Sequence, residues 1–340
     1  MAILTGAAFD NSNLTNFFNV TMAKIDKDVR DAVFTRHTFM RYLKQIGSVK
    51  EDQTGDGCHI IWETAQGGNV AARAFTSSVE LTDPDIHRYG YEDFAEYTGA
   101  IPISHTVLQK NAGPERLIPY LDSRKKNMEK SMAYRINYDA MNGSGTFPSM
   151  VGISNLISIT PTTGTIHGVA RSGNTYVQNQ QKDSTCSTTV GFGLEVIHDT
   201  EVLLKEASKG MGDREFDLAL MDKTVHSNMT YYLPSLANSQ RVVITGNGSR
   251  NIPGDQLKYA GENTFYLGDA LAIWDFDAPS DSIRWFSKDT LQMRILRNCN
   301  FVTRDTQAER SFNRAILLGV SANMVCVNPK YTAVLNAFSS

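Results

Sequence analysis

No glycine occurs between Gly113 and Gly143, and this uninterrupted stretch constrains the fold more than any other feature of the chain. The tripeptide Gly113-Pro114-Glu115 supplies a helix breaker, a proline suited to the first helical position and an acid for the first turn. The pattern predicts a helix of about 20 residues or more, roughly 30 Å long. Because Pro119 follows closely, we expect an irregular first turn or a restart of the helix there.

The residues before this helix predict an arm and then an extended hairpin. Residues 1–50 carry spaced apolar positions separated by charges, a partly helical pattern with poor caps. Two strand-like runs, Cys58–Trp62 and Val70–Val79, are separated by a glycine pair and predict a long two-stranded hairpin. Such a hairpin is marginal by itself, so we expect it to lean on something else. Aromatic and polar residues then alternate up to Pro102, which predicts sheet with a proline at an edge.

Helices and strands alternate after the long helix, as in a mixed α/β lobe. The region up to Thr189 is rich in Thr, Ser and Gly and predicts loops and strands. Gly193–Lys209 has helical periodicity, and Asp222 is expected to cap a second helix that runs to Leu233. The chain is expected to end in a short apolar strand or helix. The other predicted strands are Phe216–Met221, Arg241–Thr245, Phe265–Leu267, Leu271–Asp275 and Leu291–Leu296.

Length and composition exclude several classes of protein. A chain of 340 residues exceeds the roughly 250–300 residues at which one core stops growing, so we expect two lobes or a lobe with extensions. The formal charge of −3 argues against a wide phosphate-binding surface. No signal peptide is apparent, and the apolar stretch around Ala315–Val327 is too interrupted to span a membrane. The cysteines lack CxxC spacing and fit free thiols in a reducing cytoplasm; they are Cys58, Cys186, Cys299 and Cys326.

Catalytic motifs are absent from the sequence. There is no GxxxxGK[ST], HExxH or GxSxG, and Gly191-Phe192-Gly193 lacks the third glycine of a dinucleotide fingerprint. The seven histidines are scattered singly, as surface or hydrogen-bonded core histidines are. Asp222 and His226 lie four residues apart on one predicted helix, but no third metal ligand is apparent from spacing. We therefore predict no catalytic, cofactor-binding or metal-binding residue and no enzymatic activity.

Charge is distributed unevenly along the chain. From Glu51 to Gly99 there are ten acids and two bases, whereas from Lys110 to Arg135 there are seven bases and three acids. An acidic hairpin and a basic helix in one chain favour pairing between neighbouring copies. The alternative is two unrelated solvated faces, because one exposed pair contributes only about 0–1 kcal/mol. The candidate contact residues are Glu51, Asp52, Asp56, Glu63, Arg73, Arg116, Arg124, Lys125, Lys126, Lys130 and Arg135.

The arm is locally basic over residues 24–50. It could contact nucleic acid or dock on a neighbour's acidic hairpin, and we favour the second, because a strongly basic surface would retain DNA. Its bases are Lys24, Lys27, Arg30, Arg36, Arg41, Lys44 and Lys50, against the acids Asp26, Asp28 and Asp31.

Several local stretches, taken in chain order, resemble one protein family. The order of arm, hairpin, strand, long helix, mixed lobe and returning strands resembles the tailed-bacteriophage major capsid proteins of the Hong Kong 97 type. Gly168–Arg171 with Tyr176–Gln180 is similar to a Gly-Ile-x-Arg and Trp-Arg-Asn-Gln pair of that family, although tryptophan and arginine are replaced here. The other similar stretches are Asn142–Gly145, Val151–Leu156, Asp217–Ser227, Leu267–Asp269 and Val325–Pro329.

The resemblance implies an α+β Hong Kong 97-type capsid fold with a peripheral lobe that carries a spine helix and an axial α/β lobe. The implied segments are 1–50 for the N-terminal arm, 51–85 for the extended hairpin loop, 86–145 for the peripheral domain with its spine helix, 146–275 for the axial domain, 276–312 for the peripheral return strands and 313–340 for the C-terminal segment.

The function that the resemblance implies is a virion shell subunit, made in the host cytoplasm. Pentamers and hexamers would close around packaged double-stranded DNA, with portal and scaffolding proteins as partners and cementing proteins left open. No cofactor is implied. The alternatives are a bacterial nanocompartment shell of the same fold, which encloses enzymes, and a soluble α/β enzyme whose site has unfamiliar spacing.

Two departures from the family refine these expectations. Some relatives weld the shell through a hairpin lysine, but no lysine occurs between Lys50 and Lys110, so we expect no such crosslink. Some relatives begin with a long charged scaffolding segment, whereas here the arm begins almost at Met1, so a separate scaffolding protein is expected.

Overall fold

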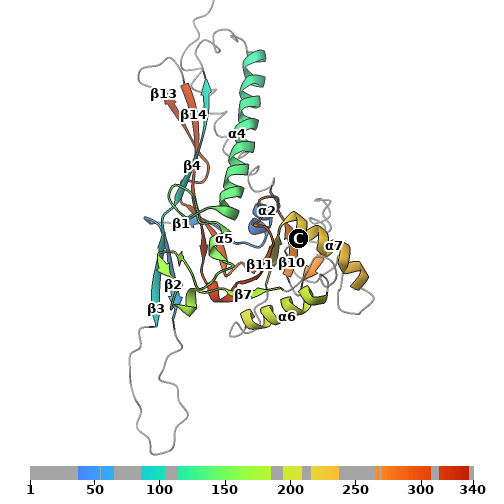
Figure 1. Ribbon diagram of the computed structural model, residues 1–340. Helices are drawn as coiled ribbons and strands as arrows, with labels where there is room; N and C mark the ends of the chain where they lie inside the picture. Colours follow the sequence, from blue (N-terminus) through green and yellow to red (C-terminus); the bar gives the residue numbers. More distant parts are fainter. Residues whose placement is uncertain are drawn as a thin grey trace, which may run out of the picture.

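The computed structural model describes residues 37–53, 55–64, 86–103, 114–184, 194–208, 216–236, 265–267, 270–307 and 314–336. These residues form two main sheets, a long helix that extends from one end of the body, and a two-stranded hairpin at the opposite end (Figure 1).

The first sheet has β14 (Arg314–Cys326) at its centre. One edge of β14 pairs antiparallel with β13 (Val302–Gln307) and then with β12 (Leu291–Leu296), and its other edge pairs with β4 (Ala95–Ile103). Strand β1 (Val49–Gln53) joins β12 in parallel. The side chains of β12 alternate between buried and half-buried, the period of two that a sheet with one covered face requires.

Helix α4 (Pro114–Asn142) lies along this sheet and is 29 residues long. It continues through Pro119, so of the two expected alternatives the restart of the helix does not occur, and its length agrees with the expected 20 residues or more. Gly99 of β4 faces its buried methionines, since a Cβ there would lie 2.8 Å from the Met132 sulfur and 3.0 Å from Met128. The missing side chain therefore lets helix and sheet approach closely.

The second sheet has six strands in the order β7-β15-β11-β8-β10-β9. All four residues of β8 are buried because both faces of the sheet are covered. Ala219 and Met221 face helices α6 (Leu194–Ser208) and α7 (Lys223–Leu236), whereas Leu218 and Leu220 face the larger core. The strands are β7 (Gln180–Asp183), β15 (Ala333–Asn336), β11 (Ser282–Phe286), β8 (Leu218–Met221), β10 (Ala270–Trp274) and β9 (Phe265–Leu267).

Helix α2 (Thr38–Gln45) fills the space between the long helix and the second sheet (Figure 1). Four of its eight residues are buried, and the Phe39 ring meets Phe286 of β11 edge to face at 6.2 Å. The aromatic contact and the apolar face of α2 bind the second sheet to the main core.

The hairpin consists of β2 (Cys58–Glu63) and β3 (His87–Glu92), paired antiparallel from Cys58↔Glu92 to Glu63↔His87. The predicted first strand is confirmed, whereas the predicted second strand, Val70–Val79, lies outside the described residues. The shorter elements are α5 (Ile153–Leu156), β5 (Thr165–Ile166), β6 (Val169–Ala170) and the 3-10 turns η1 (Thr175–Val177) and η3 (Pro329–Tyr331).

Most predicted elements agree with the structure to within a few residues. The strands predicted at Phe265–Leu267 and Leu291–Leu296 are confirmed, and the Asp222 cap is confirmed by a 2.7 Å hydrogen bond from the Val225 amide to its Oδ1. The predicted strand Arg241–Thr245 lies outside the described residues. The expected short apolar element near the end of the chain is confirmed as β15, and the 13-residue strand β14 before it was not predicted.

Strand pairing divides the chain differently from the expected segments. The segment 276–312 contains β12 and β13 of the first sheet, but it also contains β11, which pairs with β8 and β15 in the second sheet. The division into six segments therefore stays a prediction. Among the described residues, no helix is long and apolar enough to cross a membrane.

Candidate functional site

The hairpin presents an apolar strip on its outer face. Ile61 of β2 and Tyr89 of β3 are directly opposite in the register, and their exposed fractions are 57% and 71%. The inner face carries Cys58, Ile60 and Trp62, all of them buried against the body. Cross-strand pairs of this kind stabilise a sheet, but these two side chains also leave apolar area in water. The outer face is therefore a candidate contact surface.

The acidic candidates lie at both ends of this strip. Asp56 is exposed in the turn before β2, and a hydrogen bond from His59 Nε2 at 3.0 Å lowers the pKa of its carboxyl group. Glu63 is exposed at the end of β2, and Glu51 is half-buried on β1. Asp52 lies on β1 with its side chain outside the described part, and Arg73 lies outside the described residues altogether.

The basic candidates on α4 fall into two groups. Arg124, Lys126 and Lys130 are exposed, whereas Lys125 is mostly buried, 3.9 Å from the Glu129 carboxylate. Arg135 is exposed but donates from Nε to Asp139 at 3.0 Å. The side chain of Arg116 lies outside the described part of the chain. Of the described side chains, those of the first group are therefore the best placed to contact another molecule.

Two exposed tyrosines extend this basic face toward the helix C-terminus. Tyr134 and Tyr138, four residues apart, stack with ring centroids 6.3 Å apart and exposed fractions of 57% and 42%. Sequence analysis did not single them out, although their spacing on one helix face was readable. Figure 1 places α4 and the hairpin at opposite ends of the molecule, so the acidic and basic surfaces do not meet within one copy.

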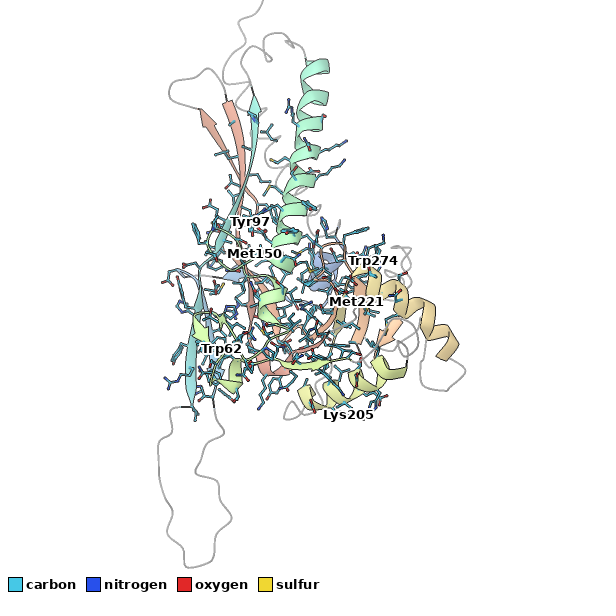
Figure 2. The ribbon with its side chains drawn as sticks, in the orientation of Figure 1. Trp62, Tyr97, Met150, Lys205, Met221 and Trp274 are labelled. Carbon is cyan, nitrogen blue, oxygen red and sulfur yellow. The ribbon has the colours of Figure 1, made fainter. Side chains whose placement is uncertain are left out.

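A groove of about 310 Å³ runs between α4 and β4. It is lined by Arg124, Met128 and Met132 of the helix and by the backbone of β4 from Tyr97 to Pro102. At its inner end the Tyr97 hydroxyl donates to Asp139 at 2.8 Å and accepts from the Met150 amide at 3.2 Å; Figure 2 labels Tyr97 and Met150. Burial raises the pKa of Tyr97, so its hydroxyl stays protonated and can donate.

Arg171 lies at the centre of a buried hydrogen-bond network. Arg171 donates from Nη2 to the carbonyls of Asn155 and Leu156 at 2.6 and 3.0 Å, and from Nη1 to Asn179 Oδ1 at 3.0 Å. The Asn179 amide in turn donates to the Ser158 carbonyl at 2.8 Å. The two stretches that resemble family motifs are thus hydrogen-bonded to each other and to the end of α5.

Asp222 and His226, the pair considered as half of a metal site, have separate roles at the start of α7. Asp222 accepts the Val225 amide, and the buried His226 ring packs near Trp274 at 6.3 Å. Among the described residues the acidic group with close ligand atoms is His37, Asp275 and Asp277, whose atoms lie within 4.8 Å of one another.

That group ties α2 and α4 to the end of β10. Asp275 accepts the Phe39 amide at 3.2 Å and Asn137 Nδ2 at 2.9 Å, and the same Asn137 nitrogen donates to Asp277 at 2.8 Å. We therefore assign these carboxylates a structural role in joining three elements.

No protein-family model and no curated protein sequence matches the chain. Solved structures do match. The cyanophage A-1(L) capsid superposes with a TM-score of 0.60 at 10% identity, over 87% of this chain and 92% of that chain. The capsid of a native GTA particle gives 0.56 at 11% identity, over 87% and 90%. The chain has the Hong Kong 97-type capsid fold.

This finding confirms the fold class that the sequence resemblance implied. The Hong Kong 97-type fold also relates the chain to the SrpI encapsulin complex of Synechococcus elongatus PCC 7942, with a TM-score of 0.51 at 11% identity, over 87% of this chain and 86% of that chain. In this fold the groove, the hairpin strip and the basic face lie on the outside of one subunit.

Proposed function

We propose that this chain is the major capsid subunit of a tailed bacteriophage. The observation that carries the proposal is the fold shared with phage capsids over most of both chains. The subunits would form pentamers and hexamers that close into an icosahedral or elongated shell around double-stranded DNA. Portal and scaffolding proteins are the proposed partners, and the virion is the proposed location.

A nanocompartment shell is the second candidate, because the SrpI encapsulin complex has the same fold. The two functions differ in what the particle encloses. Particles purified from cells that express the complete gene cluster should contain nuclease-protected double-stranded DNA. A co-purifying enzyme inside particles that lack nucleic acid would favour the nanocompartment instead.

Contacts between copies are proposed to use the acidic hairpin and the basic helix. Charge complementarity supports this pairing, since Asp56 and Glu63 border an apolar strip and Arg124, Lys126 and Lys130 border two exposed tyrosines. Each pair is weak in water, but an apolar contact between them and repetition around a shell would add many such terms. The proposed contact therefore has an apolar centre and charged ends.

Charge reversal tests this contact. Changing Asp56 and Glu63 to Lys, or Lys126 and Lys130 to Glu, should each reduce the yield of shells in negative-stain images by about tenfold or more, equivalent to about 1.4 kcal/mol. Mixing the two variant chains should restore part of the yield, because opposite charges again meet between copies.

The matched control is Lys205→Glu on α6, whose side chain is 78% exposed and lies away from both surfaces. It should leave shell yield unchanged. Failure of the mixture to restore shells, with both variants folded by circular dichroism, would contradict the pairing. A monodisperse monomer or dimer from the unmodified chain with its partners would contradict the shell function itself.

A further inference from the structure

His167 occupies a tight turn between the two shortest strands. With His167 at φ 48° and Gly168 at φ 79°, the chain reverses between Ile166 and Val169 through two residues with positive φ. Two-residue hairpins use this backbone, but they prefer Asn or Gly at the first position. A histidine there carries a local conformational cost. The turn directs its ring inward, where the side chain is fully buried.

Three other parts of the chain converge on this residue. The Trp62 indole of β2 stacks over the ring at 6.0 Å, and Figure 2 labels Trp62 at this position near the hairpin. Nδ1 lies 3.2 Å from the Glu92 carboxylate, and the Tyr91 amide donates to the His167 carbonyl at 3.1 Å. On the opposite side, the Cys326 amide at the end of β14 donates to Nε2 at 3.0 Å.

These contacts fix the protonation state of the ring. A backbone N–H can only donate, so Nε2 must keep its lone pair free to accept from Cys326. The single ring proton is therefore on Nδ1, where it donates to Glu92. A doubly protonated ring would point one N–H at another and would lose the bond to β14. Only neutral His167 fits this arrangement.

We propose that His167 is a proton-sensitive latch that holds the hairpin β2–β3 against the end of β14 and releases it when the ring takes a proton from solvent. This property belongs to the single chain and goes beyond the proposed shell function. It would make the mobility of a candidate contact surface depend on pH.

The charges around the ring set the direction of the effect. Burial lowers the pKa of His167, Arg294 of β12 and Arg171 lower it further, and Glu92 opposes them. Since the folded-state pKa lies below the ordinary histidine value of 6.5, the latch is complete above that pH and is lost as pH falls through the lower folded value.

The two thiols and the tyrosine hydroxyl near the hairpin root do not share this change. Burial raises the pKa of the Cys58 and Cys326 thiols to about 12, and a hydrogen bond with Asp93 raises that of Tyr91 to about 12. These three groups stay neutral across the range in which His167 would titrate. His59 is exposed on the outer face of β2 and lies beside Tyr91, not beside the latch.

Hydrogen exchange measured by mass spectrometry tests the latch on the full chain in its purified assembly state. At each pH, the exchange rate of the β2 and β3 peptides is divided by the rate of the same peptides in His167→Gln. As pH falls below the ordinary histidine pKa, this ratio should rise by about tenfold for each pH unit. The range runs from about pH 8 to about pH 5. Comparison at equal pH cancels the intrinsic dependence of exchange.

Two variants and one internal control make the test decisive. His167→Gln keeps a neutral acceptor but cannot titrate in this range, so its own exchange should follow the intrinsic pH dependence alone. Glu92→Gln removes the carboxylate that favours the charged ring, so the rise should continue to a lower pH than in the wild type before the transition levels off. The peptide of α6 should show no such change.

Equal profiles for wild type and His167→Gln, an unmoved Glu92→Gln transition, or parallel loss of protection in α6 would each overturn the proposal.

Discussion

At the scale of single residues, two buried arginines that have no acidic partner among the described residues explain a region that otherwise has little regular structure. Arg171 and Arg284 both donate to carbonyls at the end of α5, and the Arg284 Nε to Ile157 carbonyl distance is 3.1 Å. The last carbonyls of a helix need donors, and burial excludes water from this role. Burial also lowers the pKa of Arg284 to about 10, which still leaves it charged at neutral pH.

Replacing Arg171 by Met should destabilise the fold by about 2–5 kcal/mol, because two carbonyls and the Asn179 oxygen lose a donor in a buried place. The shift in the midpoint of urea unfolding measures the loss. Arg297→Met is the matched control, since Arg297 is exposed, and it should change stability by less than about 0.5 kcal/mol. Similar shifts for both variants would contradict the structural role of Arg171.

At the scale of elements, the sequence predicted those whose pattern is local. Helix α6 and strand β12 show their periods of 3.6 and 2 directly, and the absence of glycine revealed α4. Strand β14 was missed because Gly319, Ser321 and Asn323 interrupt its apolar run, yet pairing on both edges stabilises it.

The contact surfaces were only partly readable from sequence. The charge imbalance placed acids near the hairpin and bases on the helix. The opposition of Ile61 and Tyr89 depends on a register between distant strands, which no local pattern encodes. The role of His167 was equally hidden, because its partners come from β2, β3 and β14.

Gly90 is the position that lets the hairpin dock. A Cβ there would lie 2.4 Å from the Trp62 ring and 3.1 Å from the His167 Cβ, so Gly90→Ala must displace the indole. We expect Cys58, now buried, to react with a thiol reagent at least about tenfold faster, a change of about 1.4 kcal/mol in the opening equilibrium. Gly319→Ala, with open space around its Cβ, is the control and should react as the wild type does.

At the scale of the whole molecule, the two sheets share one chain without a clean boundary. Strands β11 and β15 belong to the second sheet, while β12 and β14, which lie between them in sequence, belong to the first. Three crossings between the two main sheets in the described part of the chain, together with the buried α2, make relative movement of the lobes costly. The parts free to adapt to a neighbour are then the exposed surfaces of the hairpin and α4.

Shells of this protein should not be covalently cross-linked through the hairpin, since the hairpin contains no lysine. Purified particles boiled in detergent should give one band near 37.7 kDa on a denaturing gel. A ladder of multiples of that mass would contradict this expectation. The same particles run with and without reductant would show whether any residual ladder comes from disulfides.

The strand pairing also has a consequence for synthesis. Early strands pair with late ones: β1 with β12, β4 with β14 and β7 with β15. A ribosome releases the chain from its N-terminus, so neither sheet can close until the last third of the polypeptide has emerged. The apolar strand edges stay unpaired during that interval. Long-range strand pairing is slow, and a chain that depends on it is prone to aggregation. A chaperone that shields the nascent chain would therefore act before the subunits assemble.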